Sequence, residues 1–219
     1  MTAISPISGV DSIGLVTSIT TTASNQETIE ELRVRFLARL RLPPLGGAAN
    51  DYLTWAFEVA GVTRAWVFPL YQGDGTVGLG FTTDNEDPII PSAAKVSEVQ
   101  AYIAERKPVT ALFTAFAPAS ATMDLDISLN PNTVETRDNV TKELEDLIKR
   151  DATLAGSYKN PLEVNDGSIL VSKIRQAISI AVGVNDYEIN TINGVAPANV
   201  IPNQGEIIVL GGLSWQNLA

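Results

Sequence analysis

Two aspartates, Asp124 and Asp126, are the residues whose types and spacing come nearest to a catalytic pair. They alternate with apolar residues, so a strand places both carboxylates on one face. Two carboxyl groups set about 5 to 10 Å apart across a cleft can hydrolyse glycosidic bonds by acid–base chemistry. The sequence shows no aromatic platform for a sugar beside them. We therefore interpret the pair as an exposed strand face and keep a carboxylate-based hydrolase as the alternative.

A second acidic group, Asp84, Glu86 and Asp87, brings together oxygen ligands of the kind that calcium accepts. The spacing is not that of a complete EF-hand loop, and acidic loops are usually solvated. We therefore expect no metal site here. Lys173 and Arg175 are interpreted as ordinary surface residues.

A glycine motif at Gly73, Gly75 and Gly78 matches the pattern G-x-G-x-x-G of dinucleotide-binding proteins. That pattern binds a pyrophosphate only where the glycines follow a strand and open a helix. Here the glycines lead into a second β-rich stretch, so we expect a hairpin turn and no cofactor.

The sequence contains neither histidine nor cysteine. Ser-His-Asp triads, Cys-His pairs, imidazole metal ligands and disulfides are therefore excluded. Because the commonest general base and the commonest zinc ligand are both missing, we expect no catalytic residues and predict that the protein is not an enzyme.

Charge and hydropathy narrow the range of partners. The formal net charge is −10, whereas binding to nucleic acid needs clustered Lys and Arg, so we expect no nucleic-acid partner. No apolar run approaches the roughly 18 residues of a membrane helix, so we expect no membrane partner. Charged residues make up 18% of the chain, below the roughly 25% of ordinary domains, which favours a surface partly covered by other proteins.

The elements that position these groups are organised around a short helix and a hairpin. Apolar residues at helical spacing predict the helix over 50–59, and two β-rich stretches over 62–68 and 76–82 predict the hairpin. On the second of these strands Gly78 and Gly80 share one face. A face of glycines predicts that another backbone or a partner element packs closely there, so both glycines are candidate partner contacts.

Beyond the hairpin, helices and strands follow one another with short connections. The predicted elements are a helix after Pro91, a strand over 109–116, an alternating strand over 121–129, a helix over 133–153, a helix capped by Ser168, and closing strands over 187–192 and 206–214. The alternating strand has one polar face, which favours antiparallel pairing. The polar loop over 154–167, with Tyr158 in it, is a candidate contact point.

The predicted fold class is α+β. We expect an N-terminal strand and helical segment followed by two ferredoxin-like α+β units with mainly antiparallel sheets. The expected division of the chain is a lead-in of a strand and two helices over residues 1–60, a first α+β unit over 61–119 and a second over 120–219.

The lead-in contains a β-branched stretch over 13–20, which suits a strand, and a helix over 28–41. The predicted buried stripe of that helix includes Ile29 and Phe36. The same helix carries the densest basic cluster of the chain: Arg33, Arg35, Arg39 and Arg41. A solvated helix face is the favoured interpretation, and docking onto an acidic neighbour, such as the later half of a second copy, is the functional one.

The run G-G-x-A-x-D-Y-x-x-W-A-x-E-V-x-G-V-T-R-A-W-V, over residues 46–67, resembles the baseplate J-like family of contractile phage tails. Shorter matches are E-E-L-R-x-R over 30–35 and K-P-V-T-A over 107–111. The resemblance covers about residues 4–215. It implies that a further β-rich region precedes this stretch in the family, so we expect this chain to correspond to the family's C-terminal portion.

The resemblance implies a structural wedge protein, one that rings the tail hub and moves outward when the sheath contracts. It also implies that the partners are other baseplate wedge and hub proteins and further copies of the chain. The implied location is the tail baseplate of the virion, after assembly in the cytoplasm of the host bacterium. Beside this reading, the alternative is a carboxylate-based hydrolase that attacks a cell-surface polymer at the tail tip.

Overall fold

The computed structural model describes residues 45–86, 88–160 and 163–218, together with Ile29, Arg33, Phe36 and Leu37. The chain separates into two units, Met1–Pro43 and Pro44–Ala219, and each is described by itself.

The four described residues of the first unit are helical, in agreement with the helix predicted over 28–41. Ile29 is 82% exposed and Phe36 is 59% exposed, so the prediction that they lie on a buried stripe is wrong. Apolar residues at helical spacing do predict a face that avoids water. They do not say that the surface covering it belongs to the same chain. The strand predicted over 13–20 lies outside the described residues.

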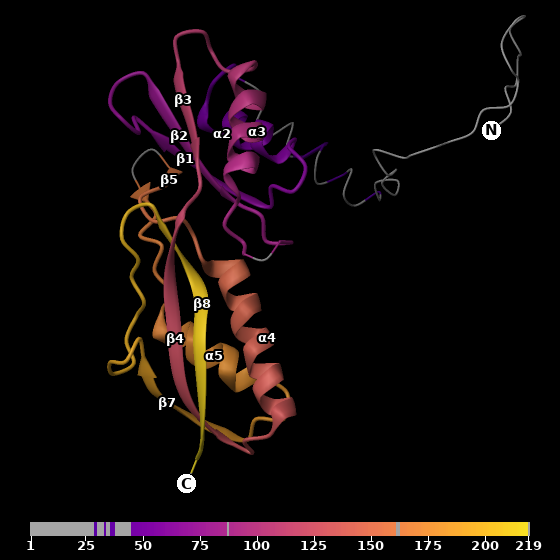
Figure 1. Ribbon diagram of the computed structural model, residues 1–219, viewed down its shortest axis with the longest axis vertical. Helices are drawn as coiled ribbons and strands as arrows, with labels where there is room; N and C mark the ends of the chain where they lie inside the picture. The colour runs from indigo at the N-terminus through magenta and orange to yellow at the C-terminus, as the bar shows by residue number, and fades with distance from the viewer. Residues whose placement is uncertain are drawn as a thin grey trace, which may run out of the picture. The chain divides into compact units, whose positions relative to one another are not determined.

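The second unit begins with a three-stranded sheet and two helices (Figure 1). Its elements are α2 (Ala49–Phe57), β1 (Arg64–Pro69), β2 (Thr76–Thr82), α3 (Ala93–Ala104) and β3 (Leu112–Phe116). The strand order is β1-β2-β3, with β1 antiparallel and β3 parallel to the central strand. Side chains of α2 and α3 pack with Leu79 and Phe81 of β2, so the two helices cover one face of this sheet.

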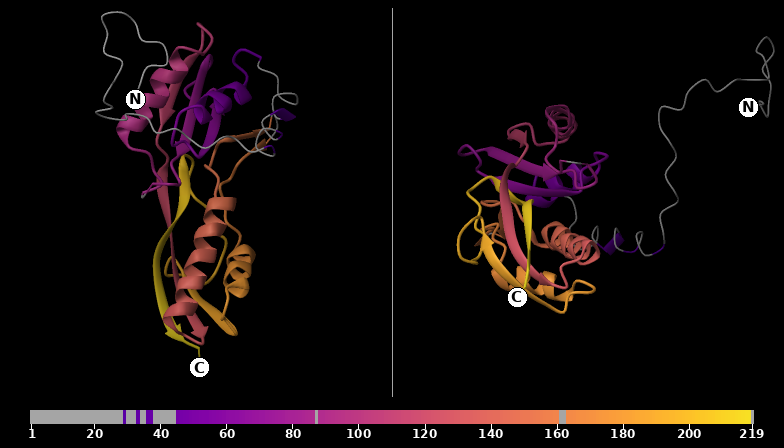
Figure 2. Two further views of the ribbon diagram at one scale, coloured as in Figure 1. Left: turned by 90° about the vertical axis from the view of Figure 1, so that its right-hand side faces the viewer. Right: turned by 60° about the horizontal axis from the view of Figure 1, so that its bottom comes forward.

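A second three-stranded sheet follows (Figure 1). Its elements are β4 (Ala119–Asn130), α4 (Val134–Asp151), a small hairpin of β5 (Tyr158–Asn160) and β6 (Glu163–Val164), α5 (Val171–Ile180), β7 (Asp186–Ile192) and β8 (Glu206–Asn217). The strand order is β7-β4-β8, with β7 antiparallel and β8 parallel to β4. Figure 2 shows α4 and α5 side by side along this sheet, and their apolar residues share one core with β4, β7 and β8.

The predicted α+β class is confirmed, whereas the structure does not show the ferredoxin-like detail. Each of the two three-stranded sheets has one antiparallel pair and one parallel pair, and the small sheet of β5 and β6 is antiparallel. The parallel pairs follow from the connections. The helix α3 carries the chain back to the start of β2 before β3 begins, and the long stretch over 193–205 lets β8 pair with β4 and not with its sequence neighbour β7.

The helices of the second unit start and stop largely where the sequence indicates. Thr133 caps α4, its hydroxyl accepting a hydrogen bond from the backbone N–H of Thr136. The predicted Ser168 cap of α5 is wrong, because the helix begins at Val171 and the distant Asn199 side chain accepts the Val171 N–H at 3.0 Å. Within the described ranges, no helix is long and apolar enough to cross a membrane.

Two apolar cores hold the second unit together. The smaller lies between the first sheet and its helices, and includes Tyr52, Val67 and Phe81. The larger lies between the second sheet and its helices, yet it also takes in Trp66 and Phe68 of β1. The face of the first sheet that the helices leave open is therefore continuous with the core of the second.

Candidate functional site

The junction between the two sheets is centred on Arg64, the first residue of β1. Its guanidinium group binds the carboxylate of Asp84 through two parallel hydrogen bonds, Nε to Oδ2 at 2.8 Å and Nη2 to Oδ1 at 2.7 Å. The remaining nitrogen, Nη1, donates to the carbonyl oxygen of Ala152 at 2.8 Å. Ala152 is the C-terminal cap of α4, so one side chain of the first sheet hydrogen-bonds to the helix end of the second.

Besides its ion pair with Arg64, Asp84 is held by hydrogen bonds with Thr63. The Thr63 hydroxyl donates to Oδ2 of Asp84 at 2.7 Å and accepts from the Asp84 backbone N–H at 2.8 Å. Burial by itself would raise the pKa of this carboxyl group. The hydrogen bonds from Arg64 and Thr63 and the charge of Arg64 outweigh that effect and hold the pKa below its ordinary value. Asp84 is therefore a charged, oriented bridge at neutral pH.

Two glycines of β2 allow side chains to pack closely over the strand at the junction. A Cβ atom placed on Gly80 would lie 2.3 Å from Cδ2 of Leu154 and 3.1 Å from the ring of Phe116. One placed on Gly78 would lie 2.5 Å from Cγ of Tyr71. The close approach predicted at these glycines is thus supplied by side chains of the chain itself, and both glycines are buried.

The start of the family-like run is explained by a backbone nest around Asp51. This buried carboxylate accepts hydrogen bonds from the backbone N–H groups of Leu45, Gly47 and Ala48, at 3.1, 2.6 and 3.0 Å. Gly46 and Gly47 adopt positive φ angles of 76° and 132°, which bring these N–H groups round to one point. The glycines and the aspartate of that run therefore fix the start of α2.

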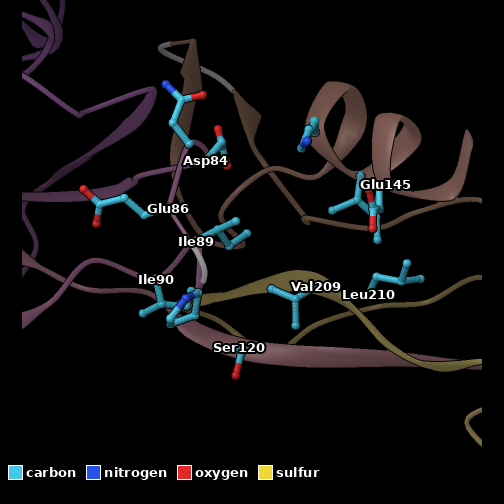
Figure 3. Close-up of a pocket in the computed structure, with 12 residues that line it drawn as sticks. Asp84, Glu86, Ile89, Ile90, Ser120, Glu145, Val209 and Leu210 are labelled. Carbon is cyan, nitrogen blue, oxygen red and sulfur yellow. The ribbon is translucent and has the colours of Figure 1, made fainter. Parts of the chain in front are cut away.

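A groove of about 610 Å³ opens beside the junction (Figure 3). Its walls come from four segments of the sequence: the loop after β2, the start of β4 at Ser120, one side of α4, and the early part of β8. The apolar lining residues are Pro88, Ile89, Ile90, Ile148, Val209 and Leu210. Asp84, Glu86 and Glu145 bring carboxylates to the lining and Lys149 brings an ammonium group.

The predicted hairpin at the glycine motif is confirmed. Strands β1 and β2 pair antiparallel. The register runs from Arg64 opposite Thr82 to Pro69 opposite Val77. Gly73 and Gly75 lie in the connecting turn with φ angles of 112° and 75°. The glycines therefore lead from strand to strand, and no helix begins where a pyrophosphate would bind.

The aspartate pair on β4 is occupied by hydrogen bonds within its own sheet. Oδ1 of Asp124 accepts the backbone N–H of Gly212 at 2.6 Å, and the carboxylate of Asp126 accepts from Nε2 of Gln216 at 2.9 Å. Both aspartates lie on one strand and do not face each other across a cleft. This geometry is unlike the opposed carboxylates that glycoside hydrolysis needs.

One of the acidic residues in the loop after β2 is held in an ion pair. Asp84 pairs with Arg64, Glu86 is exposed, and Asp87 lies outside the described residues. Among the residues that the structure describes, no group of three or more acidic side chains is placed to hold a metal ion.

The structure describes only some of the predicted partner contacts. Arg33 is helical and exposed, while Arg35, Arg39 and Arg41 lie outside the described residues. Tyr158 begins β5 and is half-buried. Lys173 binds Asp151 at 2.8 Å on the surface, whereas Arg175 remains an ordinary surface residue by prediction.

Sequence reasoning missed Arg64, Asp84 as its partner, and the groove. A signal for the first was present, because Arg64 is a charged residue in a strand that is otherwise apolar. Such a residue needs a partner when the strand is buried on both faces. The groove left no comparable signal, since the segments that line it meet only in the folded chain.

Family models match nearly all of the second unit. The baseplate J-like central domain matches residues 44–117, and the C-terminal domain of the baseplate J-like proteins matches residues 120–216. The first match contains the sheet β1-β2-β3 and its helices, and the second contains the sheet β7-β4-β8 and its helices.

Several curated proteins are similar along most of the chain. Baseplate protein gp47 of Escherichia phage Mu is 30% identical over 226 residues, a match that covers 98% of this chain and 58% of gp47. Protein JayE of Escherichia coli strain K12 is 32% identical over 214 residues, covering 97% of this chain and 75% of JayE. A Mu-like prophage protein of Haemophilus influenzae is 33% identical, with 52% of its length covered. The chain thus spans little more than half the length of its Mu-type relatives.

A solved structure has a similar fold. A chain from the baseplate of the anti-feeding prophage, determined by cryo-electron microscopy, aligns with a TM-score of 0.54 at 11% sequence identity. The alignment covers 84% of this chain and 42% of that one. At this identity the similarity concerns the fold.

Proposed function

The chain belongs to the baseplate J-like family, and on that premise we propose that it is a structural subunit of the baseplate of a contractile phage tail. In this role it is a wedge component of the ring around the hub, and it passes the contraction signal to the sheath. The observation that carries the proposal is the match of the two family models to the two sheets, one model to each. The phage Mu relative is itself named a baseplate protein.

The junction supports a role in transmitting movement. Arg64 links the first sheet to the end of α4 through charge-assisted hydrogen bonds, and Trp66 and Phe68 extend the larger core into β1. A side chain from one sheet that is fixed in the core of the other resists sliding between them. A displacement applied to one sheet is then carried to the other.

The proposed partners are other wedge and hub proteins of the baseplate and further copies of the chain. The arginine cluster of the first unit and Tyr158 remain the proposed contact residues, the arginines meeting an acidic surface. We propose no nucleic-acid or membrane partner, no cofactor and no catalytic residue. The proposed location is the tail of the virion, after assembly in the host cytoplasm.

The hydrolase alternative has no support. Neither the family match nor the named relatives point to it, and Asp124 and Asp126 lie on one strand, each with a hydrogen-bond donor from β8.

Purified tails provide the test. Tails isolated from the particle that encodes this chain are analysed by mass spectrometry, and tails from a strain lacking its gene are imaged. The proposal predicts that the chain is present in stoichiometric amount and that the deletion abolishes baseplates. Absence of the chain from intact tails, or normal baseplates in the deletion strain, would overturn it.

A further inference from the structure

The outer edge of β3 is covered by one polar side chain. In the order β1-β2-β3 this strand lies at the end of its sheet, and α3 lies beside it (Figure 1). Gln100, on α3, donates from Nε2 to the carbonyl oxygen of Phe113 at 3.0 Å, and its Oε1 accepts the backbone N–H of Ala115 at 2.6 Å. One side-chain amide thus binds an acceptor and a donor of the same strand.

The two backbone groups that Gln100 binds face away from β2. Leu112 donates its N–H to the carbonyl oxygen of Gly75, at 2.9 Å, on the side of β2. Backbone groups alternate along a strand, so those of Phe113 and Ala115 point outward. A residue of a parallel neighbouring strand would donate to the first of these groups and accept from the second. The Gln100 amide offers the same donor and acceptor as a peptide group, and it takes the place of that residue.

The strand that Gln100 covers has the composition of an aggregation-prone segment. Residues 109–116, VTALFTAF, contain no charged residue, proline or glycine, and most of them are β-branched or aromatic. Val109 is 99% exposed and Leu112 is 67% exposed, so apolar side chains at the start of this edge face solvent. Lysine, proline or other charged residues ordinarily guard an edge strand. The other edge strand of this sheet, β1, begins with Arg64 and ends with Pro69, whereas β3 has no such residue.

We infer that the Gln100 side chain is an edge guard, which occupies the outward hydrogen-bonding groups of β3 and so prevents the β3 strands of two copies from pairing. Edge-to-edge pairing needs these groups to be free. The strand that is excluded is β3 of a second copy, because identical uncharged segments pair without opposing like charges. The inference stands on the second unit alone and does not depend on the baseplate role.

Gln100→Met in the full chain tests the inference, because it removes both hydrogen bonds and keeps the length of the side chain. At low protein concentration, hydrogen–deuterium exchange of the Ala115 amide is expected to be about tenfold faster or more in this variant than in the wild type. As the concentration rises, exchange over residues 112–116 is expected to slow again, because copies then pair at β3. In the wild type, exchange at Ala115 is expected to be independent of concentration.

Gln176→Met is the matched control, since it makes the same substitution at an exposed position of α5. It is expected to leave exchange at Ala115 and its concentration dependence unchanged. Gln100→Ala removes the same amide with a residue that favours helix, and it repeats the comparison where the methionine variant does not fold.

A charge added to the edge shows where the copies pair. Thr114 is an exposed residue of β3, and Thr114→Lys places a lysine on this edge. Combined with Gln100→Met, it is expected to abolish the concentration-dependent protection while exchange at Ala115 remains fast.

The inference is wrong if the Ala115 amide exchanges at the wild-type rate in Gln100→Met, or if that variant shows no protection that grows with concentration. It is equally wrong if the Gln176 control behaves in the same way as the Gln100 variant, or if pairing survives Thr114→Lys.

Discussion

The two three-stranded sheets of the second unit share one pairing pattern and differ in what covers them. Each has a central strand with one antiparallel and one parallel neighbour. The first sheet is covered on both faces, by α2 and α3 on one side and by Leu154, Phe116 and Tyr71 on the other. The second sheet is covered by α4 and α5 on one face only, while its other face carries Asp124 and other polar residues.

This difference indicates that one sheet is buried within the chain and the other is open to partners. A sheet that is apolar on both faces is packed against other parts of its own chain. Gly78 and Gly80 show this, because their exposed backbone is covered by side chains of the same chain. A sheet with one polar face is available to other proteins on that face. Partner contacts in the second unit are therefore expected on the second sheet, and changes that open the first sheet are expected to destabilise the chain most.

Leu154→Ala should have the largest effect, because this fully buried side chain covers Gly80 and belongs to the larger core. We expect the free energy of unfolding to fall by about 3 kcal/mol, measured by urea denaturation. Val164→Ala, at an exposed position on β6, is the control and should change it by less than about 0.5 kcal/mol. Equal effects of the two variants would mean that Leu154 does not close the first sheet.

Asp84→Asn should lower the free energy of unfolding by about 2 to 3 kcal/mol at pH 7, because it leaves the guanidinium group of Arg64 without its anion. The effect should depend on pH. The pKa of Asp84 is lowered on folding, so its contribution is complete well above the ordinary value of 3.8 and is lost as pH falls through the lower folded value.

Denaturation of the wild type and of Asp84→Asn across pH 2 to 7 measures this dependence. The difference between them should shrink in the acid range below about pH 4. A difference that stays constant over the whole range would show that the charge of Asp84 does not stabilise the junction.

The glycine pair offers a sharper comparison. Gly80→Ala drives a methyl group into buried Leu154 and Phe116, and should cost about 2 kcal/mol. Gly78→Ala meets only Tyr71, whose side chain is 38% exposed and can move outward, so it should cost about half as much. Thermal denaturation ranks the two variants, and the reverse order would contradict the packing described for this face.

The polar face of the second sheet should be the most tolerant region. Ser214 on β8 is exposed, so Ser214→Ala should change the free energy of unfolding by less than about 0.5 kcal/mol. A loss of more than about 1 kcal/mol in urea denaturation would show that this face is already covered within the chain.

Local patterns allowed part of the fold to be predicted from the sequence. The alternation of β4 was correct, since Met123, Leu125, Ile127 and Leu129 are all buried. The hairpin β1-β2 and the start of α4 at Thr133 were also predicted. In each case the determining residues lie within one element or one turn, where period and turn chemistry are decisive.

What could not be predicted depends on residues far apart in the chain. The parallel pairing of β8 with β4 requires knowing that the chain crosses over β4 after β7. Asn199 replaced Ser168 as the cap of α5, although 28 residues separate Asn199 from Val171. The groove combines the loop after β2, α4 and β8, so no single stretch of sequence contains it.

A cryo-electron microscopy reconstruction of the tail that contains this chain tests the account most directly. We expect the chain to lie in the baseplate ring, with density of neighbouring proteins on the polar face of the second sheet and none against Gly78 and Gly80. It would be contradicted by a neighbouring protein inserted against those glycines, or by a baseplate in which the chain is absent.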